Sequence, residues 1–174
     1  FTFDPGLTDH FYNTKNTQIG NTFERNISDI RTNIRVNLQF KKSESLRFTF
    51  RKNTQFTDVN NLAQGYVFNN YNNIFQGNRE LEAAVVNAYN LNYRSINQFT
   101  FTNIFANASY SKRSNSIQSR ANVNGINAIR TSTNSVFPRE TYSLSGRIDK
   151  RFKNMKLNFS TRYNFSEFTN VIND

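Results

Sequence analysis

The chain of 174 residues contains no cysteine and no tryptophan, and it has only one histidine, one methionine and two prolines. Without cysteine it forms neither disulfides nor thiolate metal sites. No apolar run approaches the about 18 residues that a transmembrane helix requires. The hydrophobic fraction, 36%, is low for a compact globular domain. These absences exclude a disulfide scaffold and a membrane-spanning helix within these residues, and they argue against an ordinary soluble core.

The residues that are abundant favour strands and polar connections. There are 18 Phe and 8 Tyr, which suit half-buried pleated surfaces, and 30 Asn, which suit turns and loops. The formal charge is +10, which fits nucleic acid, an anionic membrane surface or a polar lumen as surroundings. The composition therefore predicts an all-β chain, and charge alone does not choose its partner.

Residues 142–165 predict a β-hairpin with a two-residue turn at 153–154. This turn brings apolar side chains together on one side, as the pairs Tyr142–Phe165, Leu144–Tyr163, Ile148–Phe159 and Phe152–Met155. The other side collects polar residues. Lys150 is the one charge on the apolar side, near the turn, where a lysine can extend its ammonium to water.

Residues 30–51 show the same alternation around a connection at 41–45. With five residues in the connection, Phe40 is predicted to lie opposite Leu46, and the apolar sets again share one side. A third hairpin is predicted from 83–93 and 99–112, with a turn at 94–98 and Tyr93 opposite Phe99. In this third hairpin both sides carry apolar and polar residues, so the sequence does not decide which side faces lipid.

The spacing of these hairpins indicates an antiparallel transmembrane β-barrel. Short turns near 41–45, 94–98 and 153–154 alternate with long polar stretches at 57–78 and 113–139. Outer-membrane barrels alternate short periplasmic turns with long outer loops in this way. Aromatic residues close to the turns would form a girdle at the membrane interface, namely Phe40, Tyr93, Phe99 and Phe152.

The number of strands predicts an incomplete segment of a larger barrel. Asp4-Pro5-Gly6 predicts a turn, residues 12–26 one more strand, and residues 117–131 contain a further ribbon. The total is about seven strands, whereas single-chain bacterial barrels have an even number, with about eight as the minimum. A sheet with one apolar face and two open edges is an aggregation hazard on its own.

A barrel wall assigns each face of these hairpins to lipid or to the lumen. The predicted lipid-facing residues are Ile34, Val36, Leu38, Phe48, Leu144, Ile148, Phe159 and Tyr163, with Leu144 and Phe159 at mid-membrane. The predicted lumen-facing basic residues are Arg31, Arg35, Arg47, Arg51, Arg147, Arg151 and Arg162. Nucleic-acid binding is disfavoured, because stacking on bases needs the aromatic side chains on the charged face.

Several segments carry a resemblance to a known family. The strand Leu46-Arg47-Phe48-Thr49-Phe50-Arg51 precedes a loop and then Phe75-Gln76-Gly77-Asn78-Arg79-Glu80-Leu81-Glu82, followed by Asn90-Leu91-Asn92-Tyr93. This arrangement resembles the barrel region of TonB-dependent receptor-like outer-membrane proteins of the Bacteroidetes type, although Arg79 and Ala83-Ala84 depart from the family's pattern.

The resemblance implies an outer-membrane receptor or transporter that takes up a nutrient. Its barrel would have about 22 strands filled by a plug domain. The partners would be outer-membrane lipid, the rest of the barrel, the plug and a surface lipoprotein over the loops. Gly77 and Asn78 would then lie in an outer loop that contacts cargo.

Other functions have less support in the sequence. The carboxylates are scattered without a metal or phosphate motif, and His10 reads as a loop histidine. We therefore expect no enzyme, no cofactor and no metal site. Two alternatives remain: a secreted soluble β-sandwich acting as an adhesin or glycan-binding module, and a complete eight-stranded barrel that uses 117–131 as a spanning strand.

Overall fold

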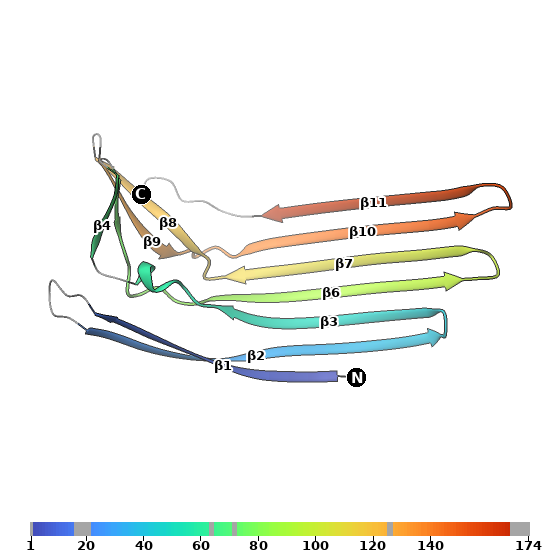
Figure 1. The fold of residues 1–174 in the computed structure, drawn as a ribbon, viewed down its shortest axis with the longest axis horizontal. Coiled ribbons are helices and arrows are strands. Elements are labelled where there is room, and N and C mark those ends of the chain that lie inside the picture. The colour runs from blue at the N-terminus through green and yellow to red at the C-terminus, as the bar shows by residue number, and fades with distance from the viewer. Residues whose placement is uncertain (1, 16–21, 63–64, 71–72, 125–126, 168–174) are drawn as a thin grey trace.

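The computed structural model describes residues 2–15, 22–62, 65–70, 73–124 and 127–167. Most of them lie in strands of two sheets, a seven-stranded sheet and a four-stranded one. The seven-stranded sheet extends as a wall, with tight turns at one end and the four-stranded sheet at the other (Figure 1). We refer to these as the turn end and the loop end. The described residues contain no helix that is long and apolar enough to cross a membrane.

The seven-stranded sheet has the order β1-β2-β3-β6-β7-β10-β11, and each neighbouring pair is antiparallel. Each strand has at least 12 residues, more than the about 9–11 that cross a bilayer as a tilted strand. Their bounds are β1 Thr2–Lys15, β2 Thr22–Lys41, β3 Glu44–Gln55, β6 Ala84–Asn97, β7 Thr102–Ser114, β10 Arg139–Arg151 and β11 Lys156–Glu167.

The predicted register of the last hairpin is confirmed. In β10 and β11, Ile148 lies opposite Phe159 and Leu144 lies opposite Tyr163. At the turn, the backbone N–H of Phe152 donates to the carbonyl of Met155 at 2.7 Å. Lys150 lies on the apolar side as expected, and its Nζ donates to Thr100 O and Thr102 Oγ1, both at 2.8 Å. The ammonium group is thereby held at the turn end.

The predicted register of β2 and β3 is wrong by two residues. Leu38, rather than Phe40, lies opposite Leu46, and an irregularity between Gln39 and Lys41 precedes a tight turn at 42–43. The sequence reading placed five residues in the connection, whereas the bulge lets the strands continue almost to the turn. Because the shift is even, every side chain keeps its predicted face.

The predicted register of β6 and β7 is wrong by an odd number. Asn97 pairs with Thr102 and Tyr93 pairs with Ala106, so the turn lies at 98–101 and not at 94–98. Asn97 Oδ1 accepts hydrogen bonds from the backbone N–H of Phe99 and of Thr100, both at 3.0 Å. This side-chain cap holds Phe99 in the turn, where the sequence reading had taken it for a strand residue.

An odd shift moves all side chains of β7 to the other face relative to β6. Ile104, Ala106 and Ala108 therefore share the apolar side with Leu91 and Tyr93. The mixed faces of the predicted hairpin resolve into one apolar and one mainly polar face. The register thus closes the question that the sequence left open for residues 83–112.

The N-terminal region also differs from the prediction. Asp4-Pro5-Gly6 lies inside β1 and does not form a turn, with Pro5 opposite Thr32. The strand β1 is at an edge of the sheet, where the missing N–H of a proline is tolerated. Residues 12–26 are divided between β1 and β2, and His10 belongs to β1 rather than to a loop.

The two long stretches between hairpins form the second sheet, which we call the loop sheet. It has the order β4-β5-β9-β8, and β5 and β9 are parallel. Its strands are β4 Tyr66–Asn70, β5 Asn73–Gln76, β8 Ile117–Asn124 and β9 Asn127–Asn134, with a 3-10 helix η1 at Val59–Asn61. The ribbon predicted within 117–131 is the β8-β9 hairpin.

The seven-stranded sheet is open, because β1 and β11 are its edges in the described part of the chain. Since β8 and β9 belong to the loop sheet, neither supplies the eighth spanning strand that a complete small barrel would need. Buried apolar side chains among the described residues are Leu62, Leu81 and Ala84. The long strands are therefore not packed around a core of their own.

Candidate functional site

One face of the seven-stranded sheet is apolar and accessible. The register places Val36, Phe48, Leu91, Ala108, Leu144 and Tyr163 in one row across six strands. Leu144 is 56% exposed and Tyr163 is 62% exposed. We call this face the belt; it comprises Ile34, Val36, Leu38, Phe48, Leu91, Leu144, Ile148, Phe159 and Tyr163, and so includes all the predicted lipid-facing residues.

A row of aromatic rings borders the belt on the side of the loop end. The rings of Phe50, Tyr89, Tyr110, Tyr142 and Phe165 follow one another across five neighbouring strands. The successive centroid distances are 4.9, 5.8, 4.8 and 6.1 Å. Such ring pairs contribute about 0.5–1.5 kcal/mol each beyond the area that they bury. We call these five residues the aromatic row.

Charged side chains begin one register row beyond the aromatic row. Lys112 Nζ lies 3.1 Å from Glu140 Oε1, and the Tyr142 hydroxyl donates to Glu140 Oε2 at 2.7 Å. Lys52 belongs to the same register row as Lys112 and Glu140, and its Nζ lies 3.7 Å from Asp29 Oδ1, three residues before its partner Thr32. From the belt toward the loop end, the apolar surface therefore ends within two register rows. The aromatic row comes first, and the ion pairs follow, with the Tyr142 hydroxyl directed toward them.

The opposite border of the belt lies at the turn end. Phe40, Phe99, Phe152 and Met155 are exposed there. Tyr93, the fourth predicted girdle residue, lies inside β6 instead, and its hydroxyl donates to Glu44 Oε1 at 2.7 Å.

The height of the belt matches a bilayer. Tyr142 and Phe152 are ten positions apart, which corresponds to about 33 Å of strand. If the strands were tilted by about 40°, as is typical of outer-membrane barrels, this length would give a band about 25 Å tall, which is the height of the apolar band in such barrels. By the same spacing Ile148 and its partner Phe159 lie near mid-height, whereas Leu144 lies next to the aromatic row and not at mid-height as predicted.

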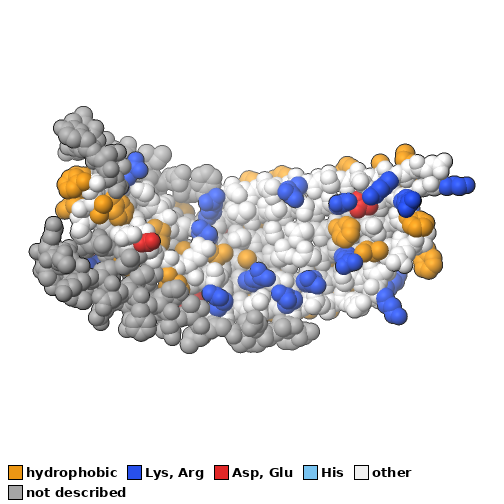
Figure 2. Space-filling view, in the orientation of Figure 1, with side chains coloured by type: hydrophobic (Ala, Val, Ile, Leu, Met, Phe, Trp, Pro, Cys, Tyr) orange, Lys and Arg blue, Asp and Glu red, His pale blue; other side chains and the backbone are white. Residues whose placement is uncertain are grey.

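The other face of the sheet is polar. Figure 2 shows this face, with Lys and Arg side chains spread over the long strands among uncharged polar groups. One register row reads Asn37, Arg47, Asn92, Asn107, Ser145 and Arg162. Arg47 Nε donates to Asn37 Oδ1 at 2.8 Å, and Asn107 Nδ2 donates to Asn92 Oδ1 at 2.7 Å. Hydrogen-bonded amides and guanidinium groups thus cover the middle of this face.

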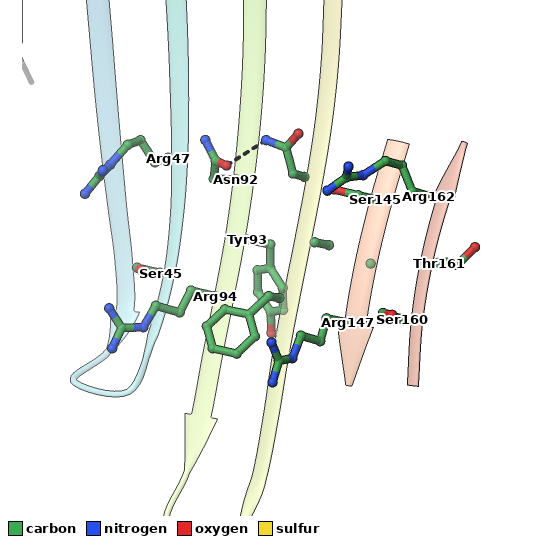
Figure 3. A pocket seen from close by; sticks show the side chains of 14 residues that line it. Ser45, Arg47, Asn92, Tyr93, Arg94, Ser145, Arg147, Ser160, Thr161 and Arg162 are labelled. Carbon is green, nitrogen blue, oxygen red and sulfur yellow. Dashed lines mark hydrogen bonds between the residues drawn. The ribbon is translucent and has the colours of Figure 1, made fainter. Parts of the chain in front are cut away.

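A groove of about 890 Å³ runs across the polar face over five neighbouring strands from β3 to β11. Its lining includes Arg47, Arg94, Arg147, Arg162 and Phe105. In Figure 3 the guanidinium groups of Arg147 and Arg162 extend toward β7, and the dashed bond joins Asn92 to its neighbour on β7. Arg147 Nε is 2.9 Å from Asp149 Oδ1. The groove is therefore wide, mainly polar and basic.

The predicted basic residues Arg31, Arg35, Arg47, Arg51, Arg147, Arg151 and Arg162 alternate with belt positions and so share the polar face. The groove gathers three of them and adds Arg94. The sequence reading missed Arg94, because it assigned this residue to a turn. Had the turn been placed at 98–101, β6 would have included Arg94 and its side chain would have been assigned to the polar face.

Gly77 and Asn78 do not lie at a loop tip. Gly77 is buried. The backbone N–H of Asn78 donates to Asn61 O at 2.6 Å, and its Nδ2 donates to Ser132 O at 3.1 Å. These bonds tie the segment after β5 to η1 and to β9, so the two residues form part of a connection between loops.

Further polar bonds join the bases of the two loop hairpins. Asn134 Oδ1 accepts from Glu82 N at 2.8 Å, and its Nδ2 donates to Glu82 O and to Asn115 O, both at 2.9 Å. Asn115 Nδ2 donates to Glu82 Oε2 at 2.8 Å. We call this set the loop joint; it comprises Asn61, Asn78, Glu82, Asn115, Ser132 and Asn134. Across the ranges that the structure describes, no group of three or more His, Cys, Asp and Glu is arranged to hold a metal ion.

Comparison with known proteins identifies a related fold. No protein-family model and no curated protein sequence matches the chain. A solved structure of a double mutant of the Serratia marcescens hemophore receptor HasR, in complex with its hemophore HasA and heme, matches with a TM-score of 0.63 at 10% identity. The match covers 94% of this chain and 29% of the receptor chain, so this chain spans less than a third of the receptor's length. The chain therefore has the fold of a β-barrel fragment similar to part of this receptor.

Proposed function

We propose that the chain forms part of the wall of a TonB-dependent receptor-like barrel in the bacterial outer membrane, which takes up a nutrient. The belt faces lipid and the polar face lines the lumen. The loop sheet lies on the outside, and the tight turns lie in the periplasm. The chain contributes a surface for passage and binding, and we assign it no catalytic role.

The observation that supports this proposal is the bounded, uncovered belt. In a soluble β-sandwich, an apolar face of this size would be buried against a second sheet. Here Leu144, Ile148, Phe159 and Tyr163 are exposed, and no layer of the described chain covers them. The aromatic row and the charges beyond it lie where the edge of a hydrocarbon layer would require them.

The partners follow from the surfaces that remain. Outer-membrane lipid would cover the belt, and further strands of the barrel would pair with the open edges of β1 and β11. A plug domain would contact the polar face, and a surface lipoprotein would cover the loop sheet. The similar receptor HasR is itself in complex with a protein, its hemophore. Nucleic acid is not a proposed partner, since aromatic and basic side chains lie mainly on opposite faces.

Single-cysteine labelling tests the two faces, because these 174 residues contain no cysteine and any cysteine elsewhere in the full-length protein can be replaced by serine. In the protein as its gene encodes it, Leu144→Cys and the adjacent Ser145→Cys would each carry a nitroxide label. In membranes, the label at 144 should collide with dissolved oxygen and be shielded from a water-soluble nickel chelate. The label at 145 should show the reverse.

The proposal fails if both labels are equally open to the nickel chelate, or if the protein is folded and monomeric in buffer without detergent. A label at the exposed loop residue Val136 is the matched control, because it should reach the chelate in every case.

A further inference from the structure

We propose that the groove on the polar face is a binding site for a dianionic ligand whose two oxyanion groups flank an apolar middle. The carboxylates or phosphates would bind the arginines, and the apolar middle would lie on Phe105. The inference rests on the proposed function only in that the groove would then face the lumen; the binding chemistry follows from the groove itself.

The arginines are concentrated in two adjacent register rows. Arg94 on β6 and Arg147 on β10 belong to one row, and Arg47 on β3 and Arg162 on β11 belong to the next. All four line the same groove of about 890 Å³, a volume typical of small-molecule sites. Arg forks bind carboxylate and phosphate oxygens in pairs, which makes such a cluster selective for oxyanions.

Most of this positive charge is not neutralised by the chain. Asp149 is paired with Arg147, through bonds of 2.9 and 3.0 Å to Arg147 Nε. Arg47 Nε binds the neutral amide of Asn37. Within the described residues no carboxylate lies at ion-pair distance from Arg94 or Arg162. A hollow that holds unpaired cations concentrates anions.

Phe105 distinguishes this groove from the rest of the polar face. The register places it between Arg94 on β6 and Arg147 on β10, and its side chain is 36% exposed. It alternates with Ile104 and Ala106, which lie on the apolar side of the sheet, so lipid contact does not explain it. A phenylalanine between two cations provides an apolar contact of the kind that orients a ligand in a mainly polar site.

The spacing defines the ligand class. Arg94 and Arg147 are two strands apart, which places their Cα atoms about 10 Å from each other, and Arg47 and Arg162 are four strands apart, or about 19 Å. Both arginines of the Arg94–Arg147 pair are long enough to reach one phosphate, but a phosphate bound there would leave Phe105, which lies between them in the register, without an apolar contact. A ligand with two anionic groups at opposite ends and an apolar part between them satisfies Arg94, Phe105 and Arg147 together.

Binding measurements on the full-length protein in detergent test this site. The probe is biphenyl-4,4'-dicarboxylate, and the matched controls are biphenyl-4-carboxylate and inorganic phosphate. We expect the dianion to bind at least about tenfold more tightly than either control, as one additional charge-assisted contact implies. Arg94→Gln should remove this advantage, and Phe105→Ala should weaken both biphenyl probes while leaving phosphate unchanged.

Arg151→Gln is the control variant, because Arg151 lies on the same face but outside this groove. It should change the affinity for the dianion by less than about twofold, as expected for a screened charge at a distance. Equal binding of the mono- and dianion, or equal effects of Arg94→Gln and Arg151→Gln, would overturn the proposal.

A groove already filled by carboxylates of the same protein would also overturn it. In that case no probe binds the natural protein, and Arg94→Gln lowers the melting temperature. The two proposals can fail separately. If only the barrel proposal is wrong, the labels at 144 and 145 are equally open to the nickel chelate, but the dianion still binds.

Discussion

The seven-stranded sheet and the loop sheet are stabilised in different ways. The long sheet consists of nearest-neighbour antiparallel hairpins, and its belt residues, such as Leu144, are exposed. The loop sheet contains a parallel pair, β5 and β9, from segments that are distant in the sequence. At its base Leu62 and Leu81 are 0% and 1% exposed, beside the loop joint.

The difference shows where each sheet obtains its stability. Antiparallel ladders and alternating faces hold the long sheet, but nothing in the described part of the chain covers its belt, which under the proposed function would be covered by lipid. The loop sheet has its own buried apolar contacts and side-chain hydrogen bonds, so it resembles a small water-soluble unit. One chain thus combines a sheet with an uncovered apolar face and a sheet with its own buried contacts, and substitutions should separate the two.

The largest expected effect is on the packing at the base of the loop sheet. Leu81→Ala removes a fully buried side chain, which should destabilise the loop sheet by about 2–5 kcal/mol. Hydrogen exchange should show loss of protection in β5 and β9, with β10 and β11 unchanged. Val136→Ala, at a residue that is 92% exposed, should have no effect. Equal loss in both sheets would contradict the separation.

The next effect concerns the belt and depends on depth. Ile148→Arg, near mid-height, should destabilise the protein in membranes by about 2–4 kcal/mol. Leu144→Arg, next to the aromatic row, should cost about 1 kcal/mol, because the penalty falls toward the interface. Denaturant midpoints of the full-length protein in lipid vesicles measure both. Ser143→Arg on the polar face is the control, and a cost equal to that of Ile148→Arg would refute the lipid assignment.

A smaller effect is expected at the loop joint. Asn134→Ala removes three hydrogen bonds to Glu82 and Asn115, which should cost about 1–3 kcal/mol. Limited proteolysis should then cut within 113–139 faster, while the belt remains protected. Asn122→Ala, at an exposed position in β8, should leave the cleavage rate unchanged. Equal cleavage rates for Asn134→Ala and Asn122→Ala would show that the loop joint does not stabilise the loop sheet.

The smallest effect concerns the aromatic row. Tyr110→Leu removes the ring contacts to Tyr89 and Tyr142 but keeps an apolar side chain. It should cost about 0.5–1.5 kcal/mol, whereas Tyr110→Phe should keep most of the ring contribution. The midpoint of unfolding in vesicles provides the comparison. Identical midpoints for the two variants would mean that burial alone, and not ring stacking, stabilises this border.

The sequence predicted the parts of the fold that depend on local alternation. The register of β10 and β11 was correct, because Tyr142–Phe152 and Met155–Phe165 are apolar on one side only around a two-residue turn. The register of β6 and β7 was wrong, because aromatic residues at 99 and 101 resemble strand residues. The Asn97 cap that places Phe99 in the turn is a geometric feature. Arg94 was missed for the same reason.

By itself, the sequence determined that this chain is a two-faced antiparallel sheet, since a period of two places phenylalanine and arginine on opposite sides wherever the strands run. The tertiary structure alone decided how the hairpins align and that the two long stretches combine into a loop sheet. It also brought Arg47, Arg94, Arg147 and Arg162 to one groove. The physical reason is that alternation acts between neighbouring residues, whereas turn caps, parallel pairing and the joint between loops depend on contacts between residues far apart in the chain.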